Sequence, residues 1–207
     1  MVSQQPPTDE ELIRRVRAGD RESFRTLIER YEVELLNFLI RLVGDRAAAE
    51  DVFQEAFLQV HQSIGSFDVE RTFRPWLFTI AANKGRDYLR KKGRQRTVDL
   101  SAPISGSGVS GDDPSGATFV DLMEIDLPGP GEALDAQERD RRVQEAVQSL
   151  PLSLREILLL SYFQKLSYAQ IAEELEIPLG TVKSRLHAAV ASFAKKWKSL
   201  NNQDASR

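Results

Sequence analysis

Four residues near the C-terminus have side chains that can read DNA. Within one short stretch they provide an ammonium, a hydroxyl, a guanidinium and an imidazole group: Lys183, Ser184, Arg185 and His187. Such groups donate hydrogen bonds to base edges in the major groove and to phosphates. An ordinary helical hairpin in a core has no reason to gather these side chains at the start of its second helix. We therefore predict a DNA-reading surface here.

The residues around this surface predict a helix-turn-helix that positions it. Ser167 followed three residues later by Gln170 is typical of a capping box, which satisfies free backbone N–H groups at a helix start. Residues 177–180 end that helix, because they contain a proline and a glycine, and the second helix is expected to begin near Thr181. Its inward-facing residues should be those that recur at helical spacing: Val182, Leu186 and Val190. A helix-turn-helix places its second helix in the major groove.

The composition argues against several other kinds of chemistry. The 207 residues include no cysteine, and the two histidines, His61 and His187, lie far apart, so we expect no metal site and no cofactor. Carboxylate pairs such as Glu50-Asp51 are surface charges by default. No glycine-rich phosphate loop or nucleophile motif accompanies them, so we do not expect an enzyme. The N-terminus lacks the features of a signal peptide and no apolar run approaches membrane-spanning length, which predicts a cytoplasmic protein without membrane insertion.

Charge is segregated along the chain, although the formal net charge is only −3. One basic block comprises Lys84, Arg86, Arg90, Lys91, Lys92, Arg94 and Arg96. A second comprises Lys183, Arg185, Lys195, Lys196 and Lys198. The intervening residues 101–140 are strongly acidic. The net charge therefore hides two basic stretches that suit nucleic acid.

The apolar pattern predicts an all-α fold of two small helical domains. Apolar residues at three- and four-residue steps indicate helices over residues 8–19, 20–44, 45–65 and about 73–93. The first two are expected to begin at the capping residues Thr8 and Asp20, and the second to end at Gly44. No alternating run is long enough to propose a sheet. Helices resume at about residue 133, after a stretch rich in Ser, Gly, Pro and Asp. We expect a four-helix domain, a flexible acidic linker and a helix-turn-helix domain, at residues 8–96, 97–132 and 133–200.

Two features of this organisation allow more than one interpretation. The apolar and acidic patch at residues 119–125 is either part of a spacer or a segment that docks on a partner. Aromatic residues around the loop at residues 66–72 suit the stacking of unpaired bases beside basic side chains. Trp76 fits the apolar stripe of the following helix and is assigned to the core, whereas Phe67 in the loop is the better candidate for contact.

Two sets of motifs, in the right order, resemble the extracytoplasmic-function (ECF) group of bacterial sigma factors. The first set is similar to their region 2 and lies at residues 51–57, 66–67 and 73–83. The second set is similar to their region 4 and lies at residues 150–160, 166–172 and 178–186. The resemblance implies a transcription initiation factor that binds core RNA polymerase and directs it to promoters through their −10 and −35 elements.

The resemblance also implies roles for individual residues. Contacts with the clamp coiled coil of the largest polymerase subunit would come from Asp51, Gln54, Glu55 and Leu58. Contacts with the −10 element, including a flipped base, would come from Phe67, Asn83, Arg86 and Arg90. Contacts with the −35 element would come from Tyr168, Thr181, Lys183, Ser184, Arg185 and His187. An anti-sigma factor is a further partner that the group implies.

A second hypothesis uses the same helix-turn-helix differently. A free-standing regulator, whose first domain dimerises or senses a ligand, would also carry this motif. Such a regulator should shift a palindromic duplex by itself, whereas a sigma factor should direct transcription only when core polymerase is present.

Overall fold

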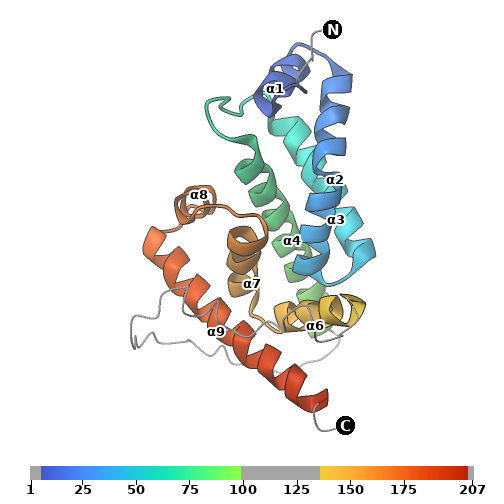
Figure 1. The fold of residues 1–207 in the computed structure, drawn as a ribbon. Coiled ribbons are helices and arrows are strands. Elements are labelled where there is room, and N and C mark those ends of the chain that lie inside the picture. Colours follow the sequence, from blue (N-terminus) through green and yellow to red (C-terminus); the bar gives the residue numbers. More distant parts are fainter. Residues whose placement is uncertain (1–5, 99–135, 205–207) are drawn as a thin grey trace.

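The computed structural model describes residues 6–98 and 136–204, and side chains over the slightly narrower ranges 6–93 and 138–202. Every regular element in these ranges is a helix, which confirms the all-α prediction. Most of the predicted linker, and with it the apolar patch at residues 119–125, lies outside the described residues. Figure 1 shows the two groups of helices, which we call the N-terminal body (α1–α4) and the C-terminal body (α6–α9).

The first two helices begin at the capping residues that the sequence predicts. α1 (Asp9–Arg17) starts after Thr8, whose hydroxyl accepts from the Glu11 N–H at 3.3 Å while the Thr8 N–H donates to the Glu11 carboxylate at 3.1 Å. α2 (Arg21–Val43) starts after Asp20, whose carboxylate accepts from the backbone N–H of the next turn. It ends at Gly44, which adopts the left-handed conformation (φ +85°) that glycine tolerates.

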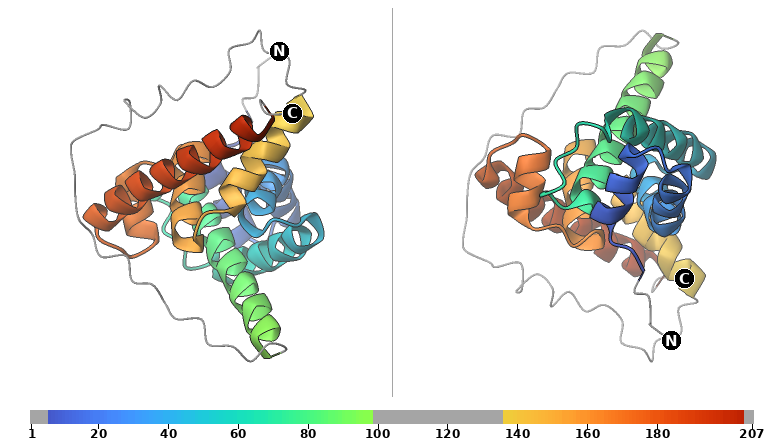
Figure 2. Two further views of the ribbon diagram at one scale, coloured as in Figure 1. Left: turned by 90° about the horizontal axis from the view of Figure 1, so that it is seen from below. Right: turned by 90° about the horizontal axis from the view of Figure 1, so that it is seen from above.

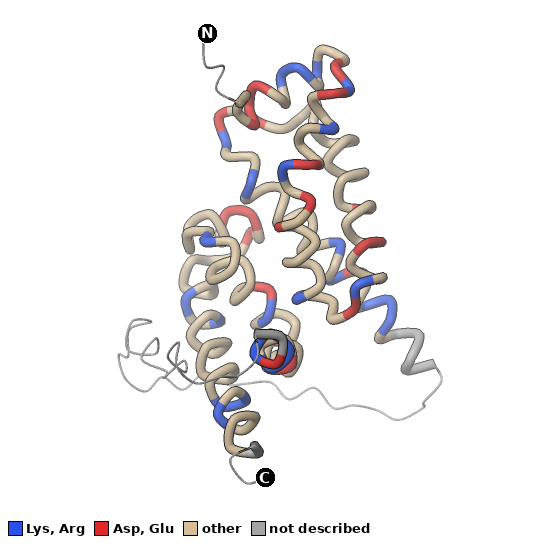
Figure 3. The backbone as a smooth tube through the Cα atoms, turned by 45° about the vertical axis from the view of Figure 1, so that its right-hand side comes forward, with Lys and Arg blue, Asp and Glu red and all other residues tan. Residues whose placement is uncertain are grey.

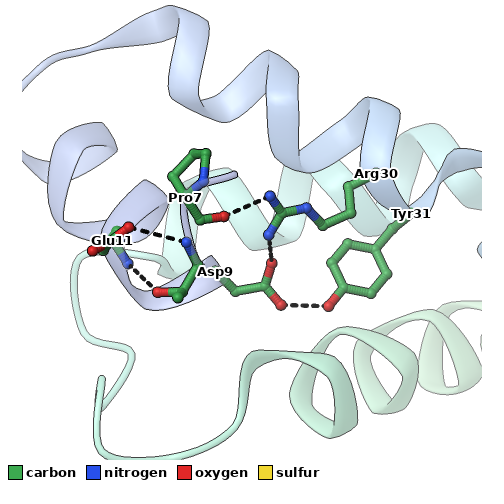
Figure 4. A network of polar contacts seen from close by, with 6 residues as sticks. Pro7, Asp9, Glu11, Arg30 and Tyr31 are labelled. Atoms are coloured by element: carbon green, nitrogen blue, oxygen red, sulfur yellow. Dashed lines mark hydrogen bonds and ion pairs between the residues drawn. The ribbon is translucent and has the colours of Figure 1, made fainter. Parts of the chain in front are cut away.

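A polar network joins the start of α1 to the middle of α2 (Figure 4). Asp9 accepts hydrogen bonds from the Arg30 guanidinium and from the Tyr31 hydroxyl. Arg30 also donates to the carbonyl of Pro7 at 2.7 Å. Burial, followed by the nearby Asp9 carboxylate, raises the pKa of Tyr31, because both disfavour the phenolate. The network therefore holds the N-terminal helix against the bundle.

The other two helices of the N-terminal body are α3 (Arg46–Ser63) and α4 (Phe73–Val98). α4 passes Gly93 and continues to Val98, so the prediction that it stops near Gly93 is wrong. A glycine inside a helix costs only about 1 kcal/mol, and good helix formers surround it in the sequence. At Gly85 the helix approaches α2 so closely that a Cβ atom there would lie 2.7 Å from Leu42.

Aromatic rings fill much of the core between α2 and α4. Phe38 and Phe78 meet edge to face, with ring centroids 5.3 Å apart and planes at 88°. Tyr31 packs against both Phe73 and Phe78 in the same manner. Edge-to-face contacts of this kind add to the stabilisation from apolar burial. These contacts pack α4 against α2 in the core of the bundle.

The C-terminal body begins with α6 (Ala136–Gln148) and α7 (Leu152–Leu158), which are separated at Pro151. A π-helical turn, η1 (Leu159–Phe163), follows α7. The helix-turn-helix consists of α8 (Tyr168–Glu174) and the long α9 (Leu179–Asp204). In Figure 1, α9 runs along the outer side of this body.

The two bodies pack against each other. α2 contacts α6 and η1, α4 contacts α8, and buried residues of both bodies belong to one continuous apolar cluster. In both views of Figure 2 the C-terminal part of α4 projects beyond the rest of the helices.

Candidate nucleic-acid and polymerase surfaces

The helix-turn-helix has the predicted capping box at Ser167, but its chain reversal lies earlier than predicted. The Gln170 N–H donates to the Ser167 hydroxyl at 3.2 Å, and the Ser167 N–H donates to the Gln170 side chain at 2.9 Å, which confirms the capping box. The chain turns at Glu176, a left-handed residue with φ +53°, instead of at Gly180. α9 therefore begins at Leu179, slightly before the predicted Thr181.

The start of α9 separates apolar and polar side chains as its periodicity predicts. Val182, Leu186 and Val190 are buried. The opposite face carries three exposed side chains, Lys183, Ser184 and His187, and two partly exposed ones, Thr181 and Arg185. Tyr168, at the start of α8, is also partly exposed. The six residues predicted to contact the −35 element thus lie on or beside one helix-turn-helix, and three of them are exposed to solvent.

The residues predicted to contact polymerase form an exposed strip on α3. Asp51, Gln54 and Glu55 are exposed, and Leu58 is 59% exposed. The opposite face of the helix is buried in the bundle through Val52, Ala56, Phe57 and Val60. A large exposed leucine among polar and acidic residues is a surface suited to a protein partner.

Three of the residues predicted to contact the −10 element lie on one face of α4, and the fourth, Phe67, lies in the preceding loop. Asn83 and Arg90 on α4 are exposed. Arg86 is partly exposed and forms an ion pair with Glu156 of the C-terminal body. Phe67 is only 5% exposed, so in this structure its ring is not accessible for the predicted contact.

Packing from other elements explains the burial of Phe67. Its ring lies against Trp76, with centroids 4.6 Å apart, and against Phe73 at 5.9 Å. The Arg17 side chain donates to the carbonyls of Ile64 and Phe67 and so holds the loop against α1. Trp76, assigned to the core from the sequence, packs against the core but is only half-buried. Arg17 was missed from the sequence, because no local pattern connects it with residues about 50 positions away.

Basic residues of both bodies line one groove. It has a volume of about 330 Å³ and lies between α4 and the helices of the C-terminal body, with Arg86, Arg90 and Arg185 at its walls and Glu156 among them. Figure 3 shows Lys and Arg along α4 where it leaves the bundle. A second ion pair between the two bodies joins Arg71 and Glu174. Burial raises the pKa of Glu174, even though the Arg71 guanidinium beside it acts in the opposite direction.

The described part of the chain contains no group of three or more His, Asp or Glu side chains placed to hold a metal ion. None of its helices is both long and apolar enough to cross a membrane.

The structure therefore has the features of a DNA-binding protein with two modules. One module is a helix-turn-helix with an exposed basic face, and the other is a helical body with its own basic helix. The Sigma-70 region 2 family matches residues 27–95, and the Sigma-70, region 4 family matches residues 140–192. The chain belongs to the ECF group of the sigma-70 family. It is therefore a promoter-specific transcription initiation factor.

Curated relatives match almost the whole chain. It is 32% identical over 188 residues to the ECF RNA polymerase sigma factor SigW of Bacillus subtilis, covering 91% of this chain and 96% of the relative. It is 34% identical to the RNA polymerase sigma-H factor of Pseudomonas aeruginosa, with 90% and 92% covered. It is 33% identical to the ECF RNA polymerase sigma-E factor of Escherichia coli, with 93% and 96% covered.

Two solved structures show the same fold. CnrH, in complex with the cytosolic domain of CnrY, superposes with a TM-score of 0.62 at 22% identity, covering 95% of this chain and 98% of CnrH. The sigma factor RpoE of Bartonella quintana, in complex with the anti-sigma factor NepR, gives 0.62 at 23% identity, with 86% and 98% covered.

Proposed function

We propose that the two bodies divide promoter recognition between them. The N-terminal body binds core polymerase and the −10 element, and the C-terminal body reads the −35 element. The observation that carries this proposal is the start of α9, where Lys183, Ser184 and His187 are exposed opposite a buried apolar face. Such a helix fits the major groove, because its donors can reach base edges without disturbing the core.

At the −35 element, the exposed donors of α9 would divide into two groups. Lys183, Ser184 and His187 would face base edges, while Thr181, Arg185 and Tyr168 lie nearer to phosphates. The N-terminus of α9 adds partial positive charge, because the first N–H groups of a helix lack intrahelical partners. This division accounts for both sequence preference and general affinity.

At the −10 element, α4 supplies the accessible contacts. Asn83 and Arg90 are exposed and available to a separated strand, and Arg86 becomes available when its ion pair with Glu156 breaks. Phe67 can stack on a flipped base only if the loop held by Arg17 moves away from Trp76. Base capture in this chain therefore requires a rearrangement of residues 66–72.

The polymerase contact is assigned to the exposed strip on α3. Leu58 would be the apolar centre of the contact, with Asp51, Gln54 and Glu55 forming hydrogen bonds and ion pairs around it. Catalysis belongs to the polymerase, and the chain acts in the cytoplasm with it. RpoE of Bartonella quintana binds an anti-sigma factor in its solved complex, and we extend a partner of that kind to this chain.

Run-off transcription with reconstituted bacterial core polymerase over a promoter library tests this function. We expect transcription from a subset of promoters only when both the chain and core enzyme are present. Replacing Lys183, Ser184 and His187 together with alanine should abolish selection at −35. The control Ser192→Ala, which changes an exposed residue further along α9, should leave selection intact.

Two outcomes would contradict the proposal. One is a failure of the purified chain to associate with core polymerase. The other is a shift of a palindromic duplex by the chain alone, without polymerase-dependent transcription, which would favour the free-standing regulator.

A further inference from the structure

A pocket outside the proposed DNA and polymerase surfaces lies where α2, the start of α4 and residues 163–170 meet. Its volume is about 510 Å³, which is within the range of small-molecule sites. None of the residues assigned above to polymerase, to the −10 element or to the −35 element lines it. The pocket is therefore available for a role that promoter recognition does not use.

The charged residues that line this pocket leave one positive charge in excess. Arg74 donates to the carboxylate of Glu34 at 2.8 Å, so these two charges balance each other. Lys165 also lines the pocket, is exposed, and pairs with no carboxylate of the described residues. A ligand with a single negative charge would neutralise the pocket, whereas a second negative charge would have no counterpart.

Gln164 adds a hydrogen-bond donor whose orientation is fixed. The residue is 4% exposed, and its side-chain oxygen accepts from the Arg74 guanidinium at 2.9 Å. A guanidinium can only donate, so the atom that faces it is the oxygen and not the nitrogen. The NH₂ group of Gln164 has no hydrogen-bond partner within residues 6–93 and 138–202. A nearly buried donor of this kind is stabilised by an acceptor that enters the pocket.

A second amide group and an apolar wall complete the lining. The side-chain oxygen of Gln170 accepts from the Ser167 N–H at 2.9 Å, which leaves the NH₂ group of Gln170 free to donate. Pro75, Phe163 and Leu166 provide the apolar part of the lining. An apolar wall with a few converging donors is the usual composition of a site for a small organic molecule.

Two irregularities of the backbone place these groups. In the π-helical turn η1, the Gln164 N–H donates to the carbonyl of Leu159 at 3.1 Å. Lys165 follows in the left-handed conformation, with φ +53°, which is uncommon for a residue with a Cβ atom. π-helical turns and strained residues of this kind occur often at functional sites. Here the strained residue carries the unpaired cation of the pocket.

We propose that this pocket binds a small organic carboxylate that has one negative charge and an apolar, planar body. The carboxylate accepts from the Lys165 ammonium and from the NH₂ groups of Gln164 and Gln170, while the planar body packs on Phe163 and Pro75. The single excess positive charge favours a carboxylate over a doubly charged phosphate ester. The proposal goes beyond promoter recognition and does not depend on it.

A titration of the isotope-labelled, full-length protein with cinnamate, followed by proton–nitrogen NMR, tests the proposal. The side-chain NH₂ signals of Gln164 and Gln170 should shift in a saturable way, with a Kd of about 5 mM or lower for a ligand of this size. Cinnamamide keeps the ring and lacks the charge, so it should bind at least about tenfold more weakly. Acetate, which carries the charge without the ring, should produce no saturable shift.

The variant Lys165→Gly tests the excess cation without straining the fold, because glycine tolerates the left-handed conformation. It should weaken cinnamate binding about tenfold, to about the level of cinnamamide. The matched control is Glu176→Gly, because Glu176 is exposed, has the same φ of +53° and does not line the pocket. This control should leave the affinity for cinnamate unchanged.

The variant Gln164→Glu tests the amide donor. It keeps an oxygen that accepts from Arg74 and replaces the NH₂ group with a second oxygen, which would repel a carboxylate ligand. Cinnamate binding should fall at least about tenfold. The variant also removes the Gln164 NH₂ signal from the spectrum and so assigns that signal in the wild type.

Three outcomes would overturn the carboxylate site. The first is the absence of a saturable shift at Gln164 and Gln170, and the second is equal affinity for cinnamate and cinnamamide. The third is an equal change of affinity in Lys165→Gly and Glu176→Gly. Because the titration contains neither DNA nor polymerase, cinnamate binding can stand where run-off transcription fails, and the reverse.

Discussion

The helix-turn-helix and the loop before α4 carry side chains suited to nucleic acid, but the fold presents them in opposite ways. On α9, Lys183 and His187 are exposed where the helical period places them. In the loop, Phe67 turns inward onto Trp76 and Phe73. The direction of a helical side chain follows from its position relative to the buried stripe. A loop has no such period, so packing from other elements decides where its side chains point.

The largest expected effect is the loss of stability when Phe67 is truncated. Phe67→Ala should lower the free energy of unfolding by about 3–5 kcal/mol, because it removes a buried ring from an aromatic cluster. Urea denaturation followed by circular dichroism measures this change. Leu58→Ala, at an exposed position, is the control and should stay within about 0.5 kcal/mol. A loss below about 1 kcal/mol for Phe67→Ala would mean that the ring is exposed in solution.

On α9 we expect a substitution to change DNA recognition and to leave stability almost unchanged. His187→Ala should weaken discrimination between −35 sequences by about 1–3 kcal/mol at the base pair that the imidazole reads, while stability stays within about 0.5 kcal/mol. Polymerase affinity should not change, because His187 lies on the other body from the α3 strip. Run-off transcription on promoters with altered −35 elements, compared with polymerase pull-down, measures the two effects. Equal reductions in −35 discrimination and in polymerase affinity would contradict the division of these two roles between the bodies.

A buried polar contact should give the N-terminal body a characteristic dependence on pH. The pKa of Tyr31 is raised in the folded protein, chiefly by burial and then by Asp9, so the unfolded chain ionises first above pH ~10. The contribution of Tyr31 to the free energy of unfolding is therefore complete below that pH and is lost as the pH rises further. Relative to Tyr31→Phe, the wild type should lose up to ~1.4 kcal/mol of unfolding free energy per pH unit.

Chemical denaturation at several alkaline pH values measures this difference. Because the variant keeps the ring and lacks only the hydroxyl, other ionising groups cancel in the comparison. Parallel curves for the two proteins above pH ~10 would show that Tyr31 is accessible and not held by Asp9.

The smallest effect is expected at the start of α8. Ser167→Ala should cost about 1 kcal/mol, because the Gln170 N–H loses its acceptor. Hydrogen exchange should show faster opening of α8, with the amides of α2 unchanged. Thr8→Ala makes the matched change at the capping box of α1 and should loosen only that helix. If Ser167→Ala accelerated exchange equally throughout both bodies, α8 would not open independently of the other helices.

Most local structure was predictable because its causes are local. The capping residues Thr8, Asp20 and Ser167 and the stop at Gly44 act within one helical turn, and the structure confirms each of them. The extension of α4 past Gly93 was not predicted, since a helix stop is a small energetic preference that neighbouring helix formers outweigh. The site assignments on α3 and α9 agree with the exposed faces, although their roles in binding stay predictions.

The sequence by itself determined the class of fold, the order of the helices and the face that α9 turns to solvent, because periodicity and caps express short-range physics. Tertiary structure alone decided three other features: the inward turn of Phe67, its loop held by Arg17, and the pairing of Arg86 with Glu156. The polar contacts among them join residues about 50 to 70 positions apart. Their partners become neighbours only after the helices have packed, so no local pattern encodes them.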